Sequence, residues 1–68
     1  MFAVKETNLN AAGNPVHYIP ARDYADACQI LRVERESMSL EWTEGTDYTI
    51  DVVEIADDFD FAQQPDWN

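Results

Sequence analysis

Hydrophobic and polar residues follow two different periods along this chain, and the change of period predicts its elements. Alternating or β-branched and aromatic residues at 2–7, 16–19, 38–42 and 48–55 predict four strands, because successive side chains of a strand point to opposite faces. Residues 23–35 instead place apolar side chains at i, i+3, i+4 and i+7, which predicts an amphipathic helix. The predicted order is therefore ββαββ.

The predicted helix carries signals at both of its ends. Asp23 is an expected N-cap, Asp26 lies favourably near the positive end of the helix, and Arg32 and Arg35 fall in the last turn, where cations are favoured. One helix on one face of a four-stranded antiparallel sheet, an α+β fold, is the simplest way to bury the apolar stripes. The core side chains expected from this fold are Tyr24, Leu31, Leu40, Trp42, Ile50 and Val52.

The chain reads as one domain over residues 1–68, ending in an acidic aromatic tail at 56–68. Aromatic side chains among aspartates are found both in peptides that order on binding and in tails that fold back on their own domain. We expect Phe59 or Phe61 to pack onto the sheet and Trp67 to be freer. Trp67 is either an anchor for a partner or a cap that packs back.

Charge is divided sharply along the chain. The net charge is −10, and the 33 residues after Arg35 hold ten acidic side chains with no Lys, Arg or His. Such a potential repels nucleic acid and anionic membranes and attracts a basic groove on a partner. It exceeds what solubility alone requires of so short a chain.

No group of residues predicts an active site, a cofactor site or a metal site. Asp57, Asp58 and Asp60 lack the glycine and the final Glu of a calcium loop. Cys28 lies on the apolar stripe of the predicted helix and His17 in a predicted strand, so a Cys–His pair would need both to leave those positions. A single cysteine excludes an internal disulfide, and no export signal or membrane span is evident, so we expect a reducing cytoplasm.

Carboxylates on strands can imitate the charge spacing of a nucleic-acid backbone. Residues two apart on one strand face lie about 6.8 Å from each other and neighbouring strands about 4.8 Å apart, so a sheet can present carboxylates as a rigid lattice. Glu41 and Asp51 are expected on one surface of adjacent hairpin strands. The predicted partner-binding residues are Glu41, Glu44, Asp47, Asp51, Asp57, Asp58, Asp60 and Trp67.

The stretch from Ile19 to Ala27, IPARDYADA, resembles the strand-to-helix junction of small ββαββ proteins of phages and mobile elements. With its length and acidity, the chain is similar in kind to phage-encoded anti-CRISPR and anti-restriction proteins, several of which are acidic DNA mimics. This resemblance implies a monomeric, non-enzymatic inhibitor in the cytoplasm of an infected bacterium. Its partner would be the basic DNA-binding channel of a defence or CRISPR surveillance complex. The alternative is a small acidic interaction or assembly module that docks through its aromatic C-terminal tail.

Overall fold

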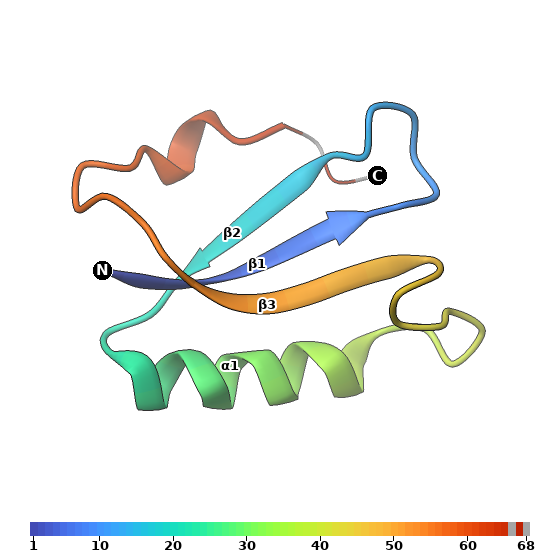
Figure 1. The fold of residues 1–68 in the computed structure, drawn as a ribbon, viewed down its shortest axis with the longest axis horizontal. Coiled ribbons are helices and arrows are strands. Elements are labelled where there is room, and N and C mark those ends of the chain that lie inside the picture. Colours follow the sequence, from blue (N-terminus) through green and yellow to red (C-terminus); the bar gives the residue numbers. More distant parts are fainter. Residues whose placement is uncertain (66, 68) are drawn as a thin grey trace.

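The fold is that of a computed structural model, which describes residues 1–65 and Trp67. One helix packs on one face of an antiparallel sheet whose strand order is β2-β1-β3, with the first strand in the centre (Figure 1). The α+β class is as predicted. The described elements are β1 (Phe2–Asn8), β2 (Val16–Pro20), α1 (Tyr24–Ser37), β3 (Tyr48–Glu54) and the 3-10 turn η1 (Phe61–Gln63).

The prediction of a four-stranded sheet is wrong, because residues 38–42 form no strand. Backbone N–H groups of this segment donate locally instead: that of Met38 donates to the carbonyl of Arg35, and that of Trp42 to the carbonyl of Ser39. Leu40 consequently points into solvent at 103% relative exposure, so its predicted place in the core is also wrong. Trp42 still packs against the core, since a turn returns its side chain to the protein.

The helix begins as the sequence predicts. The carboxylate of Asp23 caps it by accepting a hydrogen bond of 2.8 Å from the N–H of Asp26. Ala27 is fully buried, but Tyr24 is 59% exposed, so the predicted core position of Tyr24 is wrong. Tyr24 lies in the first turn, where its ring packs edge-to-face with that of Phe2 at a centroid distance of 5.5 Å. The side chain of Leu31 packs against the core, as expected.

The core lies between α1 and the even-numbered side of β1. Val4 is fully buried on the central strand, with Ile19 of β2 and Val52 of β3 as its cross-strand neighbours. Tyr48 and Ile50 of β3 are also buried, and α1 covers mainly β1 and β3. Glu6 falls on this same side of β1, which places a carboxyl group at the edge of the core.

The C-terminal tail folds back along β2. The ring of Phe59 contacts that of Tyr18 edge-on at a centroid distance of 4.8 Å. The side-chain amide of Gln64 donates to the carbonyl of Tyr18 and accepts from its N–H, so it covers the outer edge of β2 as a strand would. Contrary to the expectation that Trp67 would be freer, its ring packs against that of Trp42 at a centroid distance of 5.8 Å. No described helix has the length and apolar character needed to cross a membrane.

Candidate functional site

Three of the predicted partner-binding acids lie in the segment between α1 and β3. Glu41 is exposed, but it is not on a strand beside Asp51 as predicted. Glu44 is held by the guanidinium of Arg35, with 2.7 Å between Oε1 and Nε. The carboxylate of Asp47 accepts from the N–H of Thr43 at 2.7 Å and from an amide nitrogen of Asn10, and these hydrogen bonds lower its pKa.

Three further acids follow β3 at its other end. Asp57 accepts a hydrogen bond of 2.8 Å from the N-terminal ammonium of Met1, and this bond lowers the pKa of Asp57. Asp60 caps the short turn η1 by accepting from the N–H of Ala62, while Asp58 is exposed. Asp51 lies between the two groups, opposite Lys5 on β1.

The predicted acids therefore form two groups at opposite ends of β3 (Figure 1). Over a strand of seven residues the ends lie roughly 20 Å apart. We call Glu41, Glu44 and Asp47 the loop acids, and Asp57, Asp58 and Asp60 the tail acids. Asp51 is the one predicted site residue that bridges them. Trp67 belongs to neither group, because it packs at a separate pocket on the helix side of the sheet.

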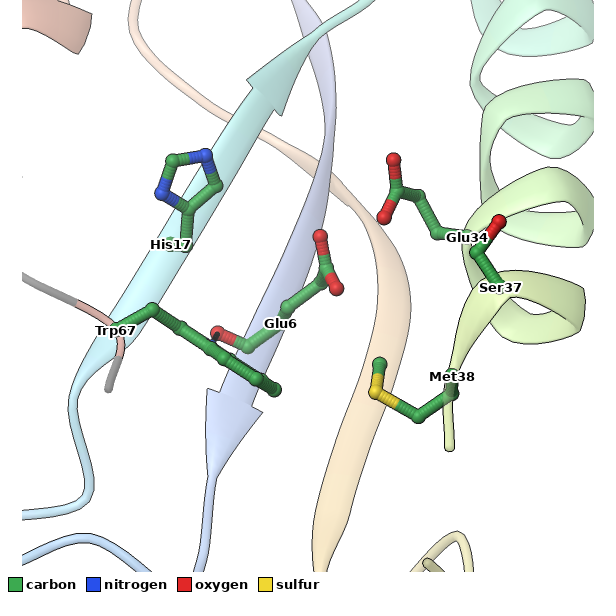
Figure 2. Close-up of a pocket in the computed structure, with 6 residues that line it drawn as sticks. All are labelled: Glu6, His17, Glu34, Ser37, Met38 and Trp67. Atoms are coloured by element: carbon green, nitrogen blue, oxygen red, sulfur yellow. Dashed lines mark hydrogen bonds between the residues drawn. The ribbon is translucent and has the colours of Figure 1, made fainter. Parts of the chain in front are cut away.

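This pocket has a volume of about 280 Å³ and lies between the sheet, the end of α1 and the tail (Figure 2). β1 and β2 bring Glu6 and His17 side by side, because the two are cross-strand partners on one face. The indole of Trp67 donates to the carbonyl of Glu6 at 3.1 Å, and the side chain of Asn8 donates to the carbonyl of Trp67 at 2.8 Å. The lining residues are Glu6, His17, Glu34, Ser37, Met38 and Trp67.

Glu6 is the chemically unusual residue of the pocket. It is only 6% exposed, and Figure 2 shows its carboxyl group near that of Glu34 on α1. Burial, the charge of Glu34 and a hydrogen bond between the two carboxyl groups raise the pKa of Glu6 from its ordinary 4.5 to about 7. Near neutral pH the carboxyl group of Glu6 is therefore only partly ionised.

Two arginine side chains bind carboxylates outside the pocket. Arg22 lies 3.5 Å from Asp26 and Arg35 lies 2.7 Å from Glu44, and the third ion pair among the described residues joins Met1 and Asp57. Within that part of the chain, none of the ion pairs involves Glu6 or Glu34. The carboxyl groups of the pocket are thus open to a cation from outside.

The described residues contain no group of three or more His, Cys, Asp and Glu side chains arranged to hold a metal ion. Cys28 is a half-buried free thiol on α1, whereas His17 is half-buried on β2 and lines the pocket.

Sequence reasoning missed the pocket, although one signal of it was present. Glu6 lies in phase with Phe2 and Val4, so an ionisable residue occupies an inward position of a strand. The contributions of Glu34 and Trp67 depend on the placement of the helix and the tail, which no local pattern specifies.

Comparisons of the chain with protein-family models, with curated proteins and with solved structures find no match.

Proposed function

We propose that this protein is a non-enzymatic inhibitor that binds a basic nucleic-acid-binding surface and competes with nucleic acid for it. The observation that supports this function is the segregation of charge, which leaves ten acids and no base after Arg35. Among residues 1–65 and Trp67, nine acidic side chains are exposed: Asp23, Glu36, Glu41, Glu44, Asp51, Glu54, Asp57, Asp58 and Asp60.

The positions of these acids suit a groove that receives a phosphate backbone. The loop acids and the tail acids lie roughly 20 Å apart, with Asp51 between them on a rigid strand. Phosphates on one strand of a duplex follow at about 3.4 Å along its axis. A basic channel that binds several successive phosphates therefore presents Lys and Arg side chains over a length similar to the distance between the two groups of acids. From the resemblance to phage-encoded inhibitors, we propose a bacterial defence complex as the partner.

Docking through the aromatic tail, the second candidate function, draws less support. Trp67 packs on Trp42 and its indole donates to the carbonyl of Glu6. An anchor role would require this side chain to leave those contacts before it could enter a groove on another protein.

The proposed function is tested by competition. A purified type I CRISPR surveillance complex is mixed with fluorescently labelled duplex DNA, and the protein is added at 50 and 300 mM NaCl. We expect displacement of the duplex at the lower salt concentration and a loss of at least about tenfold in potency at the higher one, because attraction between charged surfaces is screened. Binding of the protein to the complex without loss of duplex affinity would refute direct competition.

A matched pair of variants separates the position of the charges from their sum. Glu41→Lys with Asp58→Lys reverses one loop acid and one tail acid, and the triple variant A25K/Q29K/E36K adds the same +4 on exposed positions of α1. Both variants have a net charge of −10 + 4 = −6. The first should lose about tenfold in potency and the second less than about threefold. Equal losses would mean that only net charge matters.

A further inference from the structure

The pocket beside Glu6 has the chemistry of a site for an organic cation. Two carboxyl groups from different elements, Glu6 of β1 and Glu34 of α1, face the same space (Figure 2). Glu6 is more than nine-tenths buried, and no ion pair of the described residues neutralises either group. A buried carboxylate without a cationic partner is costly, so a cation entering the pocket would gain strongly from pairing with it.

The remaining walls favour a flat and partly apolar cation. The indole of Trp67 is seen edge-on in Figure 2, with one ring face turned toward the carboxyl groups. Aromatic faces attract cations and stack on planar guanidinium groups. The thioether of Met38 adds a polarisable apolar surface on the helix side. These walls would contact the stem of a long side chain while its head reaches the carboxylates.

We propose that this pocket binds a guanidinium group, as carried by an arginine side chain of a protein partner, between the carboxylates of Glu6 and Glu34 and the indole of Trp67. A guanidinium has five N–H donors in a planar fork, so it can bridge two neighbouring carboxylates and stack on the indole at once. An ammonium is a compact point charge and cannot use the ring face in the same way.

Guanidinium binding here is independent of competition with nucleic acid, because it can be measured on the free protein with a small molecule. The protein is labelled with ¹⁵N and titrated with Nα-acetyl-arginine amide while the indole N–H signal of Trp67 is followed by NMR. That N–H bonds to the carbonyl of Glu6, so its signal reports on the pocket. The signal is assigned with Trp67→Phe.

A saturable shift of this signal is expected with the arginine derivative. Nα-acetyl-citrulline amide has the same shape without the charge and should bind at least about tenfold more weakly. Equal binding of the citrulline derivative would overturn the proposal. Binding of Nα-acetyl-lysine amide as tight as that of the arginine derivative would overturn the assignment to guanidinium, as would shifts confined to the loop and tail acids.

Charge-neutralising variants test the two carboxylates directly. Glu6→Gln and Glu34→Gln should each lower the affinity at least about tenfold, since each removes a charge-assisted hydrogen bond. Glu36→Gln removes the same charge from an exposed position of α1 and should change the affinity less than about twofold. If Glu6→Gln fails to fold, Glu34→Gln still decides the test. A loss in Glu36→Gln equal to that in Glu34→Gln would overturn the proposal.

The pH dependence of binding is a second readout. The titratable groups that face Glu6 are Glu34 from α1 and His17 from β2, whereas β3 contributes the apolar Ile50 opposite it. Because the bound cation needs ionised carboxylates, affinity should rise roughly tenfold between pH 6 and pH 8. His17→Gln should retain this rise and Glu6→Gln should reduce it. A flat profile in the unaltered protein would overturn the proposal.

Discussion

At the scale of single residues, Glu6 is a buried ionisable group whose burial lowers stability and whose carboxylate would attract a cation. Its carboxyl group lies on the helix side of the central strand, in phase with the fully buried Val4. The surrounding protein removes water from it, and the neighbouring carboxyl of Glu34 repels its charge, so its pKa rises to about 7. The same two effects favour a cation that could enter the pocket.

The raised pKa of Glu6 predicts that the protein loses stability as pH rises. The folded state binds this proton more tightly than the unfolded state, whose carboxyl has its ordinary pKa of 4.5. Stability is therefore greatest below about pH 4.5 as far as this group is concerned, and it is lost as pH rises to 7 and above. We expect the free energy of unfolding to fall by about 2–3 kcal/mol between pH 5 and pH 8.

Urea denaturation followed by tryptophan fluorescence measures this fall. Glu6→Gln should remove most of it, because glutamine stays neutral in both states. Glu36→Gln, an exposed change of the same charge, should keep it. An undiminished fall in Glu6→Gln would show that burial of Glu6 is not its cause.

At the scale of elements, the segment after α1 shows that alternation alone does not make a strand. Met38 and Trp42 pack against the core while Leu40 points outward. A turn can place these side chains in this way without forming a strand. A strand needs hydrogen bonds to a neighbour, and this segment bonds to itself and to Arg35 through Glu44. β3 meets that need by pairing along the whole of β1.

This difference predicts opposite results for two aliphatic truncations. Ile50→Ala should cost about 2–5 kcal/mol of unfolding free energy, because Ile50 of β3 is 3% exposed and its removal leaves a cavity. Leu40→Ala should stay within about 0.5 kcal/mol of the unaltered protein, since Leu40 is fully exposed. Thermal and urea unfolding measure both. A large loss of unfolding free energy in Leu40→Ala would contradict the exposed position of Leu40.

At the scale of the whole molecule, the stability that the small core provides is reduced by repulsion among many negative charges. A domain of this size buries only about 60% of the surface of its unfolded chain, so its stability is modest. The net charge of −10 adds repulsion that the three ion pairs of the described residues relieve only at separate points. The tail adds contacts that join the C-terminal residues to β2 and Trp42.

Salt should therefore stabilise this protein. Raising NaCl from 10 to 500 mM screens repulsion between exposed acids, and each kcal/mol gained raises the melting temperature of a domain this small by roughly 4–8 °C. Circular dichroism at both salt concentrations measures the shift. The E41K/D58K variant, with two acids reversed, should show a smaller shift. A melting temperature that does not respond to salt would refute strong repulsion among the acids.

The sequence by itself determined the elements whose signals are local. The N-cap at Asp23 and the periodic apolar residues of α1 specify the helix, and the strands β1, β2 and β3 follow from alternation and β-branched residues. The charge of the second half is likewise a property of the sequence. These features depend on neighbouring residues in the chain, so they can be read without knowing the fold.

Only the tertiary structure decided which of these features meet. It placed β1 at the centre of a three-stranded sheet, left Leu40 outside and brought Trp67 back to Trp42. The pocket arises in the same way, because Glu6 and Trp67 are 61 residues apart in the chain and Glu34 comes from the helix. Long-range contacts depend on how whole faces pack and which backbone groups find partners, and no local period encodes either of these.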